Sequence, residues 1–228
     1  MKSKPASHSG NRTSLAARIG AGAWIAATVQ FLVVQLIVES AWRTPYSWAS
    51  YNISDLGNVH CQTWDVSRPR YVCSPLHYAM NTSFVVHGVL LLAGMLLAGA
   101  CWGRSRLSAS ARILFLINTG GWVLVGLVPA DIGEDLHVLG ALLIMVLGNI
   151  GLVCSGFAPR GSLFGGLRPV TFSIAAAGVV SAWMFFGQYD PGIGLGVLER
   201  GAAFALDAWA LFMALVILRA GRSGSAGG

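Results

Sequence analysis

The stretch from Tyr46 to Asn81, YSWASYNISDLGNVHCQTWDVSRPRYVCSPLHYAMN, is the only long polar run between the apolar blocks of this sequence. It contains two of the four cysteines and two of the five histidines. It also runs without a break into an apolar segment that opens with His77. We therefore interpret this stretch as an outward-facing loop that caps a bundle of membrane helices.

Six apolar blocks surround this loop, and each is long enough to cross a membrane. A helix rises about 1.5 Å per residue, so about 20 residues span an apolar slab of about 30 Å. The blocks cover residues of about 16–38, 76–102, 111–128, 136–157, 170–187 and 197–218. The first is too long for a signal-peptide core, and we expect it to be retained. The sequence thus predicts an all-α integral membrane protein, a six-transmembrane-helix bundle with a long first extracytoplasmic loop.

The composition indicates a chain that lipid surrounds. Only 11% of the residues are charged and 55% are hydrophobic, whereas soluble domains carry about 25% charged residues. The net charge of +6 does not indicate nucleic-acid binding, because the basic residues sit at the ends of the apolar blocks. We therefore expect the lipid bilayer, and no nucleic acid, as a partner.

The distribution of charge predicts the orientation. Six spans bring both chain ends to one side of the membrane, and most Lys and Arg residues fall on that side, without any Asp or Glu. Cytoplasmic loops carry such an excess of basic residues. We expect a plasma-membrane protein with both termini cytoplasmic, a disordered basic tail over residues 1–15 and a flexible tail over residues 219–228.

Two cysteines lie in the polar loop, twelve positions apart. Loop cysteines outside the cytoplasm usually oxidise, and a loop without a core needs such a link. This pattern predicts a disulfide between Cys61 and Cys73. A metal site that combines the cysteines with His60 and His77 is the competing interpretation, but the spacing is not that of a zinc module.

Several ionisable residues fall at or below the outer surface of the predicted membrane, where an ionisable group indicates function. The candidates for acid–base catalysis are His77, His137, Asp55, Asp131 and Asp207. The candidates for ligand binding are Asn81, His87, Glu39, Glu199 and Arg200. Helical spacing lets most of them point the same way, so we expect one polar chamber in the outer leaflet.

Structural roles compete with these functional ones. Glu199 and Arg200 can form an ion pair at the membrane surface, and Asp207 can be the partner of Arg200. His87, near the middle of its span, can hydrogen-bond between helices. His77 and, in the fourth span, His137 can be amphipathic residues whose polar tips reach water.

Several short strings of this sequence resemble a family signature. They are Tyr46-Ser47, Ile53-Ser54-Asp55-Leu56-Gly57, Cys73-Ser74-Pro75-Leu76-His77, Met80-Asn81 followed by Phe84 and Gly88, the string that begins at His137, and Glu199-Arg200. Over residues 16–218 the chain is similar to a bacterial and archaeal membrane family known as domain of unknown function 998. The resemblance implies a six-helix integral membrane protein and brings no established activity with it.

The polar chamber suggests a membrane enzyme that acts by acid–base chemistry on a lipid or isoprenoid-like amphiphile. We expect no cofactor; zinc held by histidines and carboxylates is a variant of this hypothesis. The alternatives are non-catalytic binding or transport, and an assembly subunit whose loop contacts another membrane protein. Transport requires a polar path in the cytoplasmic half, where only Gln30, Asn118 and Asn149 are candidates, and the spans suggest no broken helices.

Overall fold

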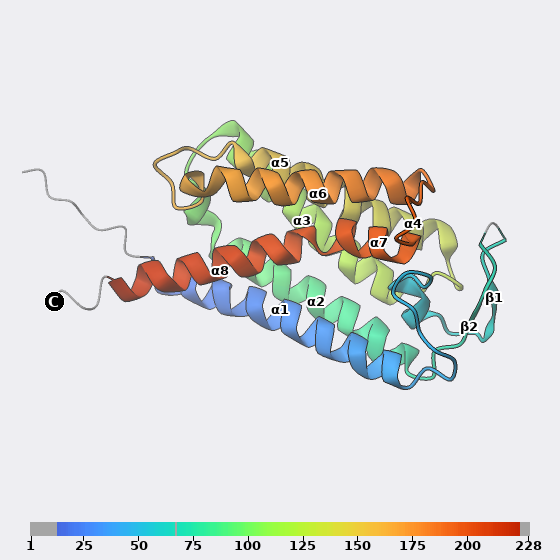
Figure 1. Cartoon of the computed structure of the whole chain (residues 1–228). Coiled ribbons are helices and arrows are strands. Elements are labelled where there is room, and N and C mark those ends of the chain that lie inside the picture. Colours follow the sequence, from blue (N-terminus) through green and yellow to red (C-terminus); the bar gives the residue numbers. More distant parts are fainter. Residues whose placement is uncertain (1–12, 67, 224–228) are drawn as a thin grey trace, which may run out of the picture.

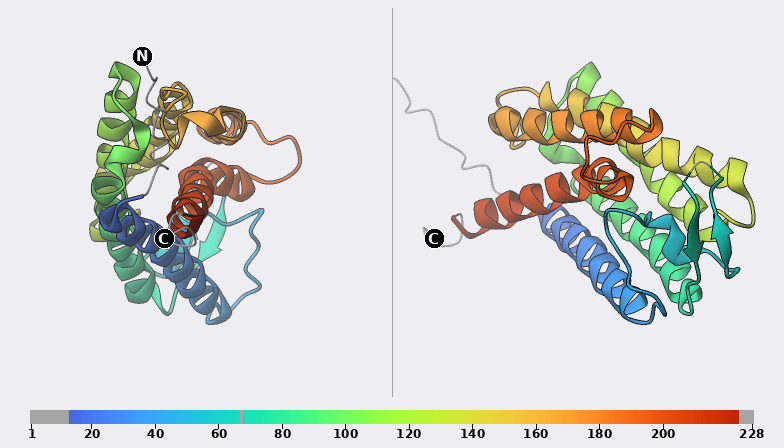
Figure 2. Two further views of the ribbon diagram at one scale, coloured as in Figure 1. Left: turned by 90° about the vertical axis from the view of Figure 1, so that its left-hand side faces the viewer. Right: turned by 45° about the vertical axis from the view of Figure 1, so that its right-hand side comes forward.

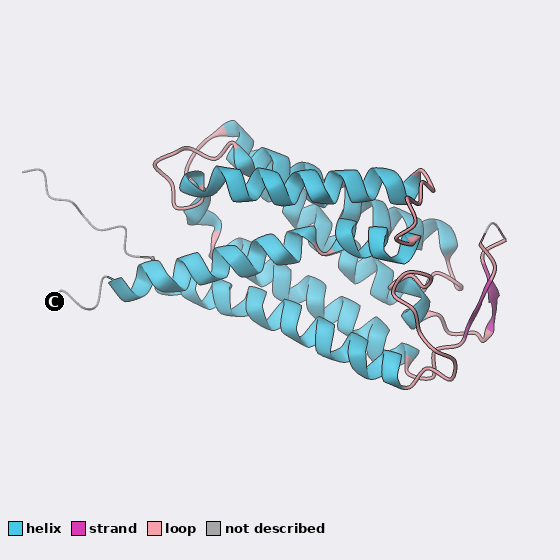
Figure 3. Ribbon diagram, in the orientation of Figure 1, coloured by secondary structure: helices cyan, strands magenta, loops and turns pink. Residues whose placement is uncertain are grey.

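The computed structural model describes residues 13–66 and 68–223, which form a bundle of helices with a loop domain at one end (Figure 1). The polar loop lies at one end of the bundle, here called the loop end. Both ends of the described chain lie at the opposite end, here called the terminus end (Figures 1 and 3). The tails predicted for residues 1–15 and 219–228 lie mostly outside the described residues, although the last helix continues to Ser223.

Six helical segments are long and apolar enough to cross a membrane. They are α1 (Leu15–Ser40), α2 (His77–Leu97), α3 (Arg106–Leu127), α4 (Glu134–Leu142) with η3 (Leu143–Leu147) and α5 (Gly148–Gly156), α6 (Arg168–Phe186) preceded by the short η4 (Gly165–Leu167), and α7 (Leu195–Ala203) with α8 (Ala205–Ser223). The predicted all-helical, multi-pass membrane architecture is confirmed.

Two helix ends differ from the predicted bounds for local reasons. The second span was expected to reach residue 102, but α2 ends at Leu97 and a separate 3-10 turn, η2 (Gly99–Trp102), follows it. The third was expected to begin near residue 111, but it begins at Arg106 because the side chain of Ser105 accepts a hydrogen bond from the N–H of Ser108. A side-chain oxygen at this position satisfies one of the free N–H groups of a helix start.

The loop contains a β-hairpin that the sequence did not predict. Strands β1 (Gln62–Trp64) and β2 (Arg70–Val72) pair antiparallel, and a 3-10 turn, η1 (Ser54–Gly57), precedes them. Cys61 and Cys73 form a disulfide at the base of the hairpin, as predicted. An isolated two-stranded hairpin is marginal in water, so the covalent link and the contacts with the bundle together maintain it.

Two of the spans are irregular, so the expectation of unbroken helices is wrong. The fourth span passes through the π-helical segment η3, and the sixth is interrupted at Phe204, between α7 and α8. Such irregularities leave backbone carbonyls without their helical partners, and in lipid another group must satisfy them.

Asparagine side chains satisfy these carbonyls. The Nδ2 of Asn149 donates to the carbonyl of Met145 in η3 and to the carbonyl of Ala202 at the end of α7, 3.0 Å away. The Nδ2 of Asn118, on α3, donates to the carbonyl of Ile144 at 2.9 Å. The two irregular helices are therefore joined to each other, and to α3, by buried amide groups.

Aromatic side chains fill the bundle toward the terminus end. Trp24, Trp102, Phe115, Phe164 and Trp209 are all buried and pack against one another. The indole of Trp24 lies against the backbone of α2 at Gly94, where an added methyl group would overlap the ring. Small residues allow helices to approach this closely. In lipid no hydrophobic effect drives helices together, so close packing of this kind stabilises their association.

We expect Gly94→Ala to destabilise the protein by about 1–3 kcal/mol, because the new methyl group overfills the contact with Trp24. Gly22→Ala is the matched control, since nothing lies within 4 Å of the added methyl group on this face of α1. There the gain in helix propensity should leave stability unchanged or slightly higher. Thermal unfolding of the detergent-solubilised variants measures both effects, and equal melting temperatures would contradict the packing argument.

Candidate functional site

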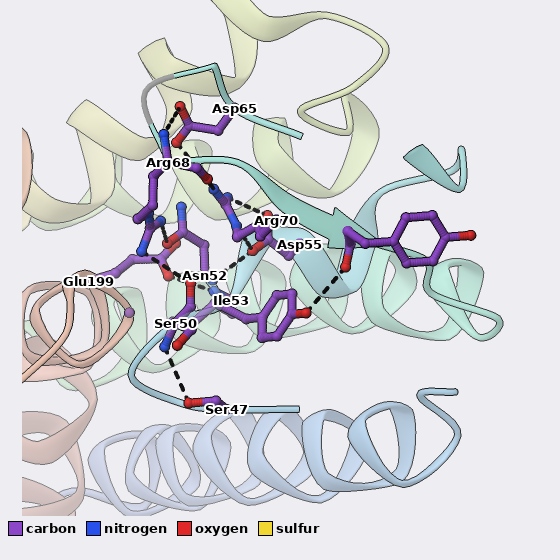
Figure 4. Close-up of polar contacts among 12 residues, drawn as sticks. Ser47, Ser50, Asn52, Ile53, Asp55, Asp65, Arg68, Arg70 and Glu199 are labelled. Atoms are coloured by element: carbon purple, nitrogen blue, oxygen red, sulfur yellow. Dashed lines mark hydrogen bonds and ion pairs between the residues drawn. The ribbon is translucent and has the colours of Figure 1, made fainter. Parts of the chain in front are cut away.

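A buried ion pair holds the loop together (Figure 4). Asp55, in η1, is 1% exposed, and both of its oxygens face Arg70 on β2: Oδ2 lies 2.7 Å from Nε and Oδ1 lies 2.7 Å from Nη2. The N–H of Asn52 also donates to Oδ2, at 2.8 Å. Burial alone would lower the pKa of Arg70, but the hydrogen bonds and charges of Asp55 and Asp65 raise it. The pair is thus a bidentate, charge-assisted contact of the strong kind.

Arg200, on α7, attaches the loop to the helices. Its Nη1 donates to the carbonyls of Trp48, Tyr51 and Gly196, and its Nη2 donates to the hydroxyl of Tyr46 at 2.6 Å. The guanidinium also lies 4.9 Å from the centre of the Trp48 ring, which adds a cation–π contact. In this arrangement both terminal nitrogens of the Arg200 guanidinium donate to the loop.

Tyr46 completes this contact from the loop side. Its hydroxyl donates to the carbonyl of Asn52 at 2.9 Å and accepts from Arg200. Burial raises the pKa of Tyr46 far above its ordinary value, so the hydroxyl keeps the proton that it donates. A methyl group at Gly196, near the start of α7, would overlap the loop carbonyls of Trp48 and Tyr51. Only glycine allows the helix and the loop to approach so closely.

The other carboxylates at the loop end accept hydrogen bonds from the same loop. Glu199 accepts from the N–H of Ile53 (Figure 4), and Asp131 accepts from the N–H groups of Val59 and His60 at 3.1 and 2.7 Å. Glu39 accepts from the indole Nε1 of Trp48 at 2.9 Å and from Gln35 at 2.7 Å. Asn81 donates to the carbonyl of Gly57 at 2.9 Å. Most of the predicted site residues at this end therefore contact the loop.

A small cavity of about 30 Å³ lies beneath the loop, and two of the predicted residues, His137 and Glu199, line it. Ser54 of the loop and Met145 of η3 also line it. Nδ1 of His137 lies 2.7 Å from the carbonyl oxygen of Val128, which can only accept. Nδ1 therefore carries a proton, and Nε2 is the atom that accepts a proton when the ring is neutral. The cavity has room for one or two water molecules.

An apolar groove of about 530 Å³ lies beside this cavity, between the fourth span and α6. Its walls include the exposed side chains of Leu142, Ile150, Val179 and Trp183. Met145 lines both the groove and the cavity. The flexible side chain of Met145 therefore contacts both the groove and the cavity of His137 and Glu199.

His87 and Asp207 form a second polar pair, near the middle of their spans. Nε2 of His87 lies 3.1 Å from Oδ1 of Asp207, and both side chains are almost fully buried. Nδ1 of His87 lies 3.0 Å from the carbonyl oxygen of Ala27. Asp207 thus lies beside His87 and not, as one alternative held, beside Arg200, because the break at Phe204 separates α7 from α8.

His77 lies apart from both pairs. Its Nδ1 lies 3.0 Å from the carbonyl oxygen of Ser74, and its ring packs 4.1 Å from that of Tyr78. The structure therefore divides the predicted single chamber: His137 and Glu199 share one cavity, His87 and Asp207 meet deeper in the bundle, and His77 joins neither.

Some residues of these sites were absent from the predicted site. Arg70 and Ser54 lie in the polar loop and carry no helical spacing that would link them to Asp55 or His137. Met145 and Thr28 look like ordinary span residues in the sequence.

In the part of the chain that the structure describes, no group of three or more His, Cys, Asp or Glu side chains is arranged to hold a metal ion.

We expect Asp55→Asn to destabilise the protein by about 3–5 kcal/mol, because it leaves the buried guanidinium of Arg70 without its main counter-charge. Asp65→Asn is the matched control: Asp65 also contacts Arg70, at 3.1 Å, but its side chain is 27% exposed. Because water reaches Asp65 and screens this contact, its loss should cost clearly less than the loss of Asp55. Thermal unfolding of purified protein and protease cleavage within the loop report the difference, and two variants of equal stability would refute the role given to Asp55.

Comparisons with known proteins support one relationship. A family model described as "Protein of unknown function (DUF998)" matches residues 25–216. Comparisons with curated proteins and with solved structures found no match. Because the family model covers most of the chain and agrees with the resemblance carried by the loop strings, this protein belongs to the DUF998 family.

Proposed function

We propose that the protein acts by acid–base chemistry on a lipid or isoprenoid-like amphiphile, with His137 and Glu199 as the reacting pair. One observation carries this proposal: a histidine and a carboxylate line the same cavity, and Met145 lines both that cavity and an apolar groove on the surface of the bundle. The groove suits the chain of an amphiphile, and the cavity suits its polar head.

The hydrogen bonds of the pair suggest distinct roles. Because Val128 holds the Nδ1 proton, Nε2 of His137 is the atom that would take a proton from the substrate. Oε2 of Glu199 accepts the N–H of Ile53, which leaves Oε1 to stabilise the imidazolium or to exchange a proton. The surrounding side chains, including Phe84 and Trp122, limit the access of bulk water.

The amphiphile would reach the pair sideways, from the lipid. The loop is attached by the contacts of Asp131, Glu199 and Arg200 and covers the direct route from above. Met145 belongs to a π-helical segment, and such segments often occur at functional sites. Methionine has several rotatable bonds and adapts readily, so rotation of Met145 would connect the groove with the cavity.

The alternatives have less support. The side chains of Gln30, Asn118 and Asn149, which could have formed a transport path, are engaged with backbone carbonyls. Trp48, which could have served an assembly partner, is tied to Glu39 and Arg200.

A strain that lacks the gene tests the proposal, with lipid and metabolite profiling after complementation. His137→Asn keeps a donor for the Val128 carbonyl but removes Nε2, and Glu199→Gln keeps an acceptor for Ile53 but removes the charge. We expect the wild-type chain to restore the profile and both variants to lower product formation by about 100-fold or more. Glu39→Gln, which alters a carboxylate outside the cavity, should restore it. Full complementation by His137→Asn and Glu199→Gln, at equal protein levels, would refute the catalytic role.

We further propose a plasma-membrane protein with both termini in the cytoplasm, as the excess of basic residues at the terminus end indicates. Alkaline phosphatase is active only outside the cytoplasm. We expect it to be inactive when fused after Gly228 and active when inserted at Val66, which is 99% exposed at the tip of the hairpin. The opposite pattern of activity would reverse the orientation.

A further inference from the structure

The helices α1 and α8 form a V that opens toward the loop end (Figure 2). They are close at the terminus end, where the hydroxyl of Thr13 donates to the carbonyl of Ile217. They diverge beyond, and the break at Phe204 directs α7 away from α1 (Figures 1 and 2). The point at which the two helices begin to separate lies near the middle of both spans.

A crevice of about 160 Å³ occupies this opening. Its walls are apolar and consist of Phe31, Leu32, Phe204, Ala208 and Leu211. Leu32 and Ala208 are exposed on the surface of the bundle, so the mouth of the crevice faces lipid. An apolar space of this size, open to hydrocarbon, favours an apolar occupant over water.

Three polar residues lie at the floor of the crevice, although nearly all of the surface that faces the crevice is apolar. Thr28, His87 and Asp207 line it, and both ionisable side chains are more than nine-tenths buried. Asp207 belongs to the first turn of α8, where the free N–H groups of the helix start favour a negative charge. Polar groups near the end of a half-helix, at mid-membrane depth, are a recurrent arrangement of ligand sites in membrane proteins.

Two atoms on this floor have no hydrogen-bond partner in the described part of the chain: Nε2 of His87 and Oδ2 of Asp207. Oδ1 of Asp207 is 3.1 Å from Nε2 but does not lie in the direction of a ring N–H bond. Leaving such atoms unsatisfied in a buried site costs free energy. Both atoms are buried, and a hydroxyl group that entered from the crevice would supply the missing partner.

The protons of the pair define what the ligand must offer. Nδ1 of His87 carries a proton, because the carbonyl of Ala27 can only accept. A buried carboxylate beside an unprotonated Nε2 would leave its charge uncompensated, so a further proton lies on Nε2 or on the carboxyl group of Asp207. In either state the floor presents one donor and one acceptor.

We propose that this crevice binds a lipophilic alcohol, a hydroxyl group on a long hydrocarbon or isoprenoid chain. A hydroxyl is the smallest group that both donates and accepts, so it satisfies His87 and Asp207 together, while its chain lies along the apolar walls. Among the described residues the crevice and the cavity of His137 share no lining side chain, so this site is independent of the proposed reaction.

A photoreactive long-chain alcohol with a diazirine in its chain tests the inference on full-length protein in lipid nanodiscs. We expect mass spectrometry to map the label to peptides of α1 and α8. Excess farnesol or dodecanol should compete, and the stronger competitor shows whether the site prefers an isoprenoid or a straight chain. Farnesyl methyl ether, which cannot donate, should compete at least about tenfold less well than farnesol, the loss expected for a hydrogen bond to a charged group.

Two variants and a control link the label to the crevice. Ala208→Phe fills the mouth and should abolish labelling, and Asp207→Asn should weaken it at least about tenfold. Leu215→Phe places the same aromatic side chain on an exposed position of α8 outside the crevice and should leave labelling unchanged. The inference is overturned if no specific label appears, if Ala208→Phe labels like the wild type, or if the methyl ether competes as well as the alcohol. Complementation by His137→Asn is measured separately, so either proposal can fail without the other.

Discussion

Charge-assisted hydrogen bonds between helix-end residues and the polar loop support the loop end of this structure. Residues 41–76 contribute only a few buried apolar side chains, among them Ile53 and Leu56, and could not fold alone. Asp131 and Glu199 accept backbone N–H groups of the loop, and Arg200 donates to its carbonyls. Such bonds are roughly twice as strong as neutral ones, and most of these are shielded from water. The loop thereby becomes a fixed roof over the bundle.

The irregular helices are the second constraint, and they create both interior sites. The π segment η3 places Met145 between the groove and the cavity of His137. The break at Phe204 separates Arg200 from Asp207. Arg200 therefore contacts the loop, and Asp207 contacts His87. Asn149 bonds a carbonyl of each irregular helix and thus maintains both departures from the regular helical pattern in a lipid environment.

Ionisable groups inside such a bundle need a partner, and this protein provides partners of two kinds. At the loop end Glu39 and Asp131 accept hydrogen bonds from the loop, which explains their positions without any ligand. His87 and Asp207 differ, because one atom of each remains without a hydrogen bond. His137 and Glu199 differ as well, because each retains an acceptor beside a cavity. Buried polar atoms without a hydrogen bond also occur on Arg200 and His77, so the mark of the two candidate sites is such an atom or a free acceptor beside a cavity or crevice.

The sequence by itself determined the six spans, the polar loop and the Cys61–Cys73 link. Length and hydropathy are local properties that lipid converts directly into helices, and two cysteines in a short loop have few other partners. Only the tertiary structure decided which polar residues meet. Asp55 pairs with Arg70 through a hairpin that has no apolar signature, and Asp207 meets His87 because a helix breaks where Asn149 can bond the freed carbonyl. Such pairings depend on how helices cross and on which distant side chain satisfies an exposed backbone group, and neither is a local property of the chain.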